Sequence, residues 1–252
     1  MRAILAASLL LAAGTIASAA GPLTAVDVMQ RADALMRGTM SEGEMEMTVV
    51  TPDWRRTMRM RFWEDSRDDR MFVRVLAPAK DRGTASLKLG NEMWMYLPSI
   101  ERSMKIPPSM MMQSWLGSDL TNDDIVKESS YKDYDHTFLD TTVIDGQRAY
   151  VIQSIPKPDA PVVWGKIITY ARTSDYLPLR QDYYDDDGQL VRRMTYSDFR
   201  RMGGRTIPAT YRLVPLTADR RGHETTLRIL SMTFDRPIPG DTFTRANLER
   251  AR

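Results

Sequence analysis

The chain has no cysteine, so neither a disulfide framework nor a thiolate zinc site is available to it. Histidine is almost as scarce, since only His136 and His223 occur and neither has a histidine companion at metal-ligand spacing. A G-x-S-x-G elbow, a Walker loop and a dinucleotide-binding fingerprint are also missing. These absences remove the most recognisable machinery of hydrolases, nucleotide-binding proteins and dehydrogenases.

Long apolar runs are missing too, except at the N-terminus. A positive start at residues 1–2 precedes an apolar stretch at 3–13, and the small residues at 17–19 suit signal peptidase. The alternative is a membrane anchor of ~20 residues, but small and polar residues dilute the second half of this stretch. We therefore predict a cleaved signal over residues 1–20, export of the mature chain, and one domain over residues 21–252.

Neither sign of charge is in large excess, with 35 Lys and Arg against 33 Asp and Glu. This near-neutral balance predicts no general affinity for nucleic acid or for an acidic membrane surface. The acidic run 185–187 before Gly188 fails the EF-hand register, because Tyr183 and Met194 would stand at the first and last ligand positions. A solvated hairpin tip explains it better, and we expect no metal or cofactor.

Alternation of polar and apolar residues at period two runs through most of the chain. It predicts strands over residues 42–49, 56–62, 69–77, 91–97, 137–143, 148–155, 163–171, 179–184, 190–198, 206–213 and 223–234. A helix is predicted over residues 24–37, opened by a capping box of Thr24 and Asp27, and a shorter one follows Thr121. With so few helices between strands, the sequence predicts a mainly β protein, either a barrel or a strongly curved antiparallel sheet.

Methionine is unusually frequent, at 18 of 252 residues, and its flexible side chain suits surfaces that accept varied apolar partners. Alternating positions of the first strands would line one face of the sheet, and the strand pattern breaks at residues 107–128, a candidate plug over that face. The residues of this candidate hydrophobic cavity are Met45, Met47, Met58, Met60, Phe62, Met71, Val73, Trp94, Met110, Met111, Trp115 and Leu116. They form either an ordinary core or an adaptable cavity for a long apolar ligand, and periodicity alone does not separate the two.

Several longer phrases resemble one family. Residues 93–98 (Met-Trp-Met-Tyr-Leu-Pro) and 116–124 (Leu-Gly-Ser-Asp-Leu-Thr-Asn-Asp-Asp) are similar to the middle of the periplasmic outer-membrane lipoprotein-sorting proteins, LolA/LolB-like, and residues 176–179, 183–191 and 222–227 extend the likeness. The resemblance implies an incomplete antiparallel β-barrel whose concave face is covered by short helices. It also implies a cavity for lipid or lipoprotein acyl chains, transient membrane contact, and an inner-membrane exporter of the resistance-nodulation-division (RND) type as partner.

We therefore expect a non-enzymatic periplasmic carrier or chaperone for lipid or lipidated cargo. A hypothesis from another class is a non-catalytic envelope sensor, or a β-domain that binds a protein partner through the same sheet. A third is an envelope hydrolase, which would need a polar pocket around His136 or His223. A lone histidine of this kind is more often a surface or strand residue.

Overall fold

The computed structural model describes residues 22–127, 131–160 and 162–250, and the signal predicted at residues 1–20 lies outside them. The strands of the first half are β1 (Met40–Val50), β2 (Arg55–Asp65), β3 (Arg70–Ala77), β4 (Ala85–Leu89), β5 (Glu92–Leu97) and β6 (Arg102–Lys105). Those of the second half are β7 (Tyr134–Ile144), β8 (Gln147–Pro156), β9 (Lys166–Arg172), β10 (Pro178–Tyr184), β11 (Leu190–Met202), β12 (Arg205–Pro215) and β13 (Glu224–Phe234).

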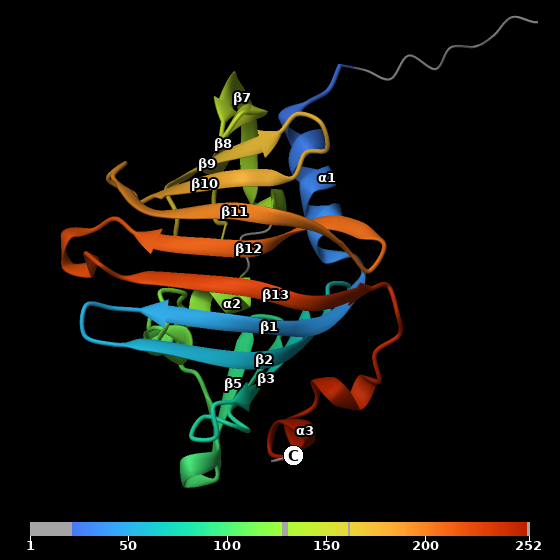
Figure 1. Cartoon of the computed structure of the whole chain (residues 1–252), viewed down its shortest axis with the longest axis vertical. Helices are drawn as coiled ribbons and strands as arrows, with labels where there is room; N and C mark the ends of the chain where they lie inside the picture. Colours follow the sequence, from blue (N-terminus) through green and yellow to red (C-terminus); the bar gives the residue numbers. More distant parts are fainter. Residues whose placement is uncertain (1–21, 128–130, 161, 251–252) are drawn as a thin grey trace, which may run out of the picture.

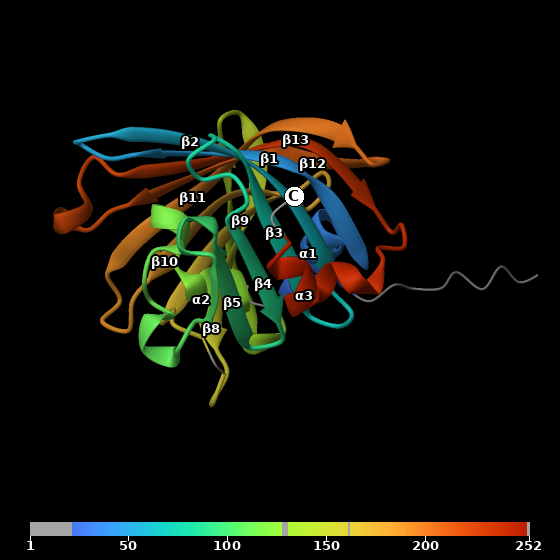
Figure 2. The same ribbon diagram turned by 90° about the horizontal axis from the view of Figure 1, so that it is seen from below.

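These strands form one antiparallel sheet in the order β6-β5-β4-β3-β2-β1-β13-β12-β11-β10-β9-β8-β7. Sequential strands are neighbours throughout, and β1 pairs with β13 where the two halves meet. Because β6 and β7 stay at opposite edges, the sheet curves without closing, as Figures 1 and 2 show. The predicted incomplete antiparallel barrel is confirmed.

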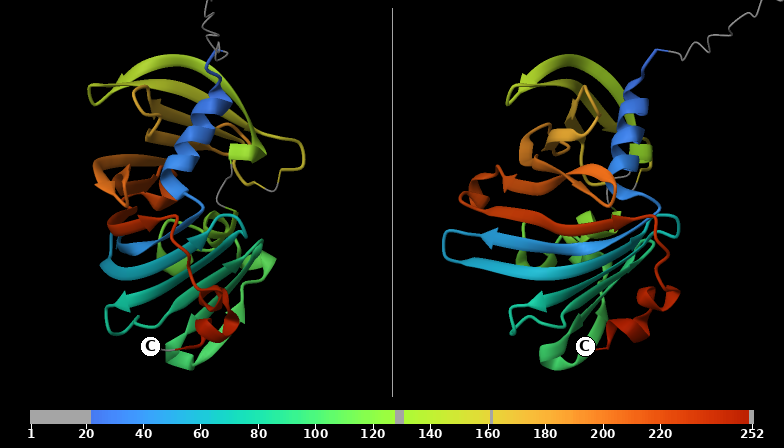
Figure 3. Two further views of the ribbon diagram at one scale, coloured as in Figure 1. Left: turned by 90° about the vertical axis from the view of Figure 1, so that its right-hand side faces the viewer. Right: turned by 45° about the vertical axis from the view of Figure 1, so that its right-hand side comes forward.

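The helices are short and few in the described part of the chain. They are α1 (Ala25–Arg37), α2 (Asn122–Lys127) and α3 (Arg245–Leu248), with 3-10 turns η1 (Pro98–Ile100), η2 (Pro108–Met110), η3 (Trp115–Gly117), η4 (Tyr131–Asp133), η5 (Ala218–Arg220) and η6 (Gly240–Phe243). None of these helices is long and apolar enough to cross a membrane. Figure 3 shows α1 running beside the strands of the second half, whereas Figure 2 shows α2 within the curve of the sheet.

Helix α1 begins where the capping box predicts. Thr24 Oγ1 accepts a hydrogen bond from the backbone N–H of Asp27 at 3.1 Å, and the Asp27 carboxylate accepts one from the backbone N–H of Thr24 at 2.9 Å. These hydrogen bonds hold the pKa of Asp27 below its usual value. The buried face of α1 then packs Val28 against Ile152 and Ala171, which attaches the helix to β8 and β9.

Two apolar clusters occupy opposite faces of the first half of the sheet, as period-two alternation requires. The cluster on the concave face contains Met47, Val49, Met58, Met60, Phe62, Val73, Val75, Met93, Ile106, Trp115, Leu120 and Val126. The cluster on the outer face contains Phe72, Ala85, Leu87, Trp94 and Tyr96, covered by Phe243 and Leu248 of the C-terminal segment. Trp94 is therefore wrong as a member of the predicted concave set, because its neighbour Met93 takes the inward position on β5.

The methionines of the concave face are expected to stabilise the fold as core residues. Met60 is 0% exposed and Met112 is 57% exposed, so the two give a matched comparison. We expect Met60→Ala to lower the free energy of unfolding by about 2–5 kcal/mol, because it leaves a cavity in packed surroundings. Met112→Ala should change it by less than about 0.5 kcal/mol. Urea denaturation measures both, and equal values would show that this face is not packed as a core.

Candidate functional site

Residues 107–127, here called the cover segment, cross the concave face of the sheet and contain η2, η3 and α2. Trp115 anchors this segment: it is 1% exposed, and its Nε1–H donates to Ser86 Oγ on β4 at 3.1 Å. Met110, Met111 and Leu116 pack partly buried against the concave cluster. The plug predicted from the broken strand pattern thus lies on the methionine-rich face.

The cover segment is also fastened by polar contacts, of which the first is at Asp119. This buried carboxylate accepts hydrogen bonds from Arg220 Nη2 at 2.9 Å and from Thr225 Oγ1 at 2.8 Å. His223 Nδ1 lies 3.5 Å from the same carboxylate. The backbone N–H of Asp119 in turn donates to Thr225 Oγ1 at 2.9 Å, so the segment is joined to β13 by side chain and backbone together.

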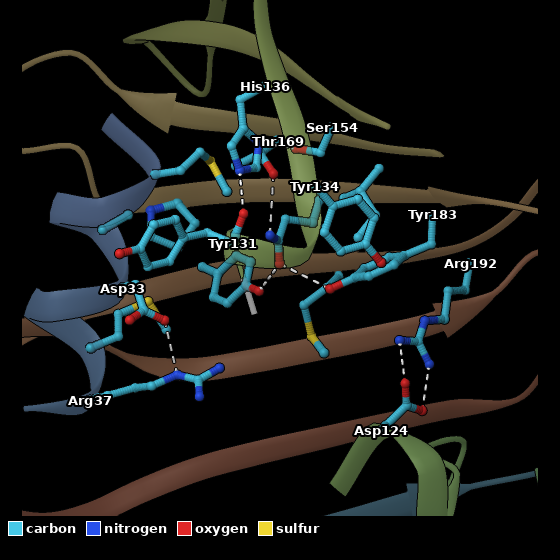
Figure 4. A pocket seen from close by; sticks show the side chains of 18 of the residues that line it. Asp33, Arg37, Asp124, Tyr131, Tyr134, His136, Ser154, Thr169, Tyr183 and Arg192 are labelled. Atoms are coloured by element: carbon cyan, nitrogen blue, oxygen red, sulfur yellow. Dashed lines mark hydrogen bonds and ion pairs between the residues drawn. The ribbon is translucent and has the colours of Figure 1, made fainter. Parts of the chain in front are cut away.

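The second polar contact joins α2 to β11. Asp124 accepts two hydrogen bonds from Arg192, at 2.7 and 2.8 Å, in a bidentate pair (Figure 4). The same carboxylate accepts a hydrogen bond from the backbone N–H of Thr121 at 2.8 Å, and Thr121 Oγ1 accepts one from the backbone N–H of Asp124 at 3.0 Å, which completes the predicted capping box. Asp124 therefore both starts α2 and fixes it to the sheet.

Arg192 sits in an aromatic environment. Its guanidinium lies 4.0 Å from the ring centre of Trp164 and 4.4 Å from that of Tyr183. Burial alone would lower the pKa of Arg192, but the Asp124 carboxylate outweighs burial and raises that pKa above its usual value. For the Tyr183 hydroxyl, burial acts in the opposite direction and raises the pKa. Arg192 is thus held in its charged form although its side chain is only 9% exposed.

An apolar hollow of about 380 Å³ lies between the cover segment and strands β2 to β6. Its apolar lining is Met58, Val75, Leu97, Met95, Met104, Ile106, Met110 and Leu116. Its polar lining includes Arg56, Asp81 and Asn122, each of which has one buried polar atom without a hydrogen-bond partner within the described residues. On the side of the cover, Arg56 donates to the carbonyl of Leu116, where Leu116 and Gly117 both adopt left-handed backbone conformations.

Apart from Trp94, which lies on the outer face, the structure divides the predicted cavity residues among three places. Met58, Met110 and Leu116 line the apolar hollow. Met47, Met60, Phe62, Val73 and Trp115 are buried in the packed core beside it, and Met45, Met71 and Met111 are partly buried against that core. Sequence reasoning missed Met95 and Met104; the alternation that places Met93 inward also places Met95 inward, so the signal for Met95 was present.

A second hollow, of about 280 Å³, lies beside α1 in the other half of the sheet (Figure 4). Its apolar lining includes Met29, Ala32, Met36, Leu120, Ile167 and Met194, and its polar lining includes Tyr131, Tyr134, His136, Gln181, Tyr183, Arg192 and Tyr196. Gln181 is at the centre of the polar part, since its Oε1 accepts from the hydroxyls of Tyr183 and Tyr196 and its Nε2 donates to Thr169. The lining comes from elements scattered along the chain, so only His136 had been singled out from sequence.

His136 points into this second hollow with both ring nitrogens occupied. Nδ1 lies 2.8 Å from Ser154 Oγ and Nε2 lies 2.7 Å from the carbonyl of Tyr131. Burial lowers the pKa of His136, and the Tyr131 carbonyl offsets part of that effect. His223 lies elsewhere, beside Asp119. The two histidines of the chain thus serve different parts of the fold.

A protein-family profile described as "Uncharacterized protein" matches residues 67–250, which is most of the chain. The chain belongs to this family. A search of curated proteins gives no match. Several solved structures have a similar fold.

Three of these structures are a DUF1329 family protein from Desulfovibrio piger, a putative outer membrane lipoprotein-sorting protein domain from Vibrio parahaemolyticus, and a LolA superfamily protein from Nitrosomonas europaea. The first is 23% identical, with a TM-score of 0.80 over 89% of this chain and 97% of that chain. The second is 21% identical, with a TM-score of 0.78 over 90% and 98%. The third is 21% identical, with a TM-score of 0.74 over 89% and 99%. The fold is therefore LolA-like, as the sequence resemblance implied.

The hydrogen bonds of Asp119 are expected to hold the cover segment against the sheet. We expect Asp119→Ala to lower the free energy of unfolding by about 1–3 kcal/mol, since it leaves the buried Thr225 hydroxyl without its acceptor. Amide hydrogen exchange in residues 113–124 should rise with it. Asp186→Ala at an exposed hairpin tip is the control and should change neither quantity. If exchange in the cover segment is the same in both variants, the carboxylate does not hold it.

His136 predicts a pH effect on stability. Burial keeps the folded-state pKa of His136 below its ordinary value of 6.5, so the unfolded chain takes up the proton more readily. The contribution of neutral His136 to the free energy of unfolding is therefore complete above pH 6.5. It is lost as the pH falls through 6.5 toward the folded-state pKa. We expect the unfolding temperature to fall more steeply from about pH 7.5 to about pH 5.5 in the wild type than in His136→Gln. Parallel curves would contradict this assignment.

Proposed function

We propose that this protein is a periplasmic carrier that binds lipid or lipidated cargo on the concave face of its sheet and shuttles it between membranes. The observation that carries the proposal is the apolar hollow of about 380 Å³ beside the cover segment. Methionines supply much of its lining, and methionine side chains adapt to apolar partners of different shape. A hydrocarbon tail is the ligand that such a lining recognises best.

Binding needs no covalent step. Each methylene of an acyl chain moved from water into an apolar hollow contributes about 0.8 kcal/mol, so a long chain is held firmly. A chain longer than the hollow requires the cover segment to move away from the core beneath it. The polar contacts of Asp119 and Asp124 reform when the segment returns, because their sheet partners stay in place on β11, β13 and the turn before β13.

Release must then deliver the cargo to a surface of equal or higher affinity for it. We propose that an inner-membrane exporter of the RND type loads the carrier, and that an acceptor membrane unloads it through transient contact. The signal predicted at residues 1–20 supports the periplasmic location. The name of the Vibrio structure, an outer membrane lipoprotein-sorting protein domain, supports cargo of the lipidated class.

Filling the apolar hollow tests this function directly. Met95 lines the hollow, whereas Val143 is 63% exposed on the edge strand β7. We expect Met95→Trp to weaken binding of the apolar dye 1-N-phenylnaphthylamine at least about tenfold, equivalent to about 1.4 kcal/mol. Val143→Trp should leave the dissociation constant unchanged. Dye fluorescence measures both, and equal affinities in the two variants would contradict the proposed site.

The second candidate function is binding of a protein partner, and the open edge of the sheet favours it. Strand β7 pairs with β8 on one side and ends the sheet on the other. Leu139 and Val143 are exposed on this edge strand. Edge strands with exposed apolar side chains are ready to pair with an extended segment of another protein. Such an envelope sensor would use β7 and leave the apolar hollow free.

A further inference from the structure

Arg192, which lines the second hollow, is only partly satisfied by its ion pair with Asp124. Arg192 lies on the concave face of β11, and its side chain is 9% exposed. It lines both the second hollow and a third one of about 260 Å³, whose lining also includes Trp164 and Asp119. Its Nε–H is buried and has no acceptor within the described residues. Asp124 therefore satisfies only part of a guanidinium that lies between two open spaces.

The carboxylate partner of Arg192 comes from the cover segment and not from the sheet. On the opposite face of the same strands, Arg193 pairs with Asp182 on the neighbouring strand β10, and Arg180 pairs with it too. Those pairs survive any movement of the cover. The Arg192–Asp124 pair does not, because Asp124 belongs to α2. If the cover moves to admit cargo, Arg192 is left as a buried charge without a partner, which is strongly unfavourable.

We propose that the carboxylate of a long-chain acid takes the place of Asp124 on Arg192 when the carrier is loaded, so that its cargo class is acidic amphiphiles. This inference rests on the proposed function and names its substrate. The planar guanidinium fork matches a carboxylate in two-point contact, and Asp124 already shows that geometry. The alkyl tail then extends through the space that the cover segment vacates, toward the apolar hollow lined by Met58, Met95 and Met110.

The exchange of carboxylates also links cargo to opening. Asp124 accepts from the backbone N–H of Thr121 as well as from Arg192, so it starts α2 and fastens it with one side chain. A ligand that binds Arg192 only when Asp124 is displaced has a higher affinity for the open arrangement of the cover than for the closed one. Its binding therefore shifts the equilibrium toward the open arrangement. The acidic headgroup thus opens the cover, and the apolar tail occupies the space that opening provides.

Calorimetric titration of the mature chain with decanoate, 1-decanol and decyl phosphate, at about pH 8 where the acid is ionised, tests this proposal. In the wild type we expect decanoate to bind at least about tenfold more tightly than 1-decanol. Arg192→Gln should bring that ratio close to one. Asp124→Asn, which weakens the internal competitor, should tighten decanoate several-fold and leave 1-decanol unchanged. Arg193→Gln, on the opposite face, is the matched control and should keep the wild-type ratio.

The possible outcomes distinguish failure of the acidic-headgroup proposal from failure of the proposed carrier function. If decanoate and 1-decanol bind the wild type equally, or Arg192→Gln weakens both equally, the acidic headgroup is wrong and the carrier function stands. If decyl phosphate binds more tightly than decanoate in an Arg192-dependent way, the carboxylate is the wrong headgroup. If neither decanoate nor 1-decanol binds, both proposals fail. Should Arg192→Gln fail to fold by circular dichroism, Asp124→Asn decides alone: unchanged decanoate affinity overturns the exchange.

Discussion

The burial of Trp115 determines where open space remains on the concave face. Its indole fills the centre of the curved sheet and donates to Ser86 on β4, and the methionines of β1, β2 and β5 pack around it. Because Trp115 and its neighbours fill this central region, the open space is divided into two hollows, one between the cover segment and strands β2 to β6 and the other beside α1. The lining of the first hollow is mainly apolar and that of the second is rich in tyrosine, so one sheet offers two chemically different surfaces to a ligand with two ends.

The contacts that hold the cover segment are of two kinds with different consequences for motion. Apolar packing at Trp115 and Leu120 favours the closed arrangement wherever water is the alternative. The ion pairs of Asp119 and Asp124 fix the register in which the segment returns. A lipid tail replaces the first kind of contact with an equivalent one, but only a charged group replaces the second. This difference is why the headgroup of the cargo matters in the proposed carrier function.

Much of the architecture followed from local patterns. Alternation predicted eleven of the thirteen strands, and capping boxes at Thr24 and Thr121 correctly placed the starts of two helices. Strand β4 was missed because it is buried on both faces and carries no alternation, and β6 because it is only four residues long. Trp94 was assigned to the wrong face, although adjacent strand residues point to opposite faces and Met93 and Trp94 therefore cannot both face inward.

The site was less predictable than the fold, for a physical reason. Period two shows that Met47 and Met60 point inward, but whether an inward side chain meets a neighbour or a hollow depends on how the cover segment packs, which no local pattern contains. The pairing of Asp124 with Arg192 joins residues far apart in the chain, and although Asp124 is part of the predicted capping box, no local pattern identifies Arg192 as its partner. The tyrosine-rich hollow likewise exists only once β7 to β11 and α1 have come together.

The central claim is that the hollows beside the cover segment hold hydrocarbon in the protein's own compartment. Native mass spectrometry of the protein isolated from the envelope of its own host, without detergent, tests this most directly. The account predicts a population heavier than the bare mature chain by the mass of an acyl-containing molecule, and collisional activation should release that molecule intact. As a control, a lipid added to the preparation should remain bound under the same conditions. If it does and the isolated protein is nevertheless found only in its bare form, the account is contradicted.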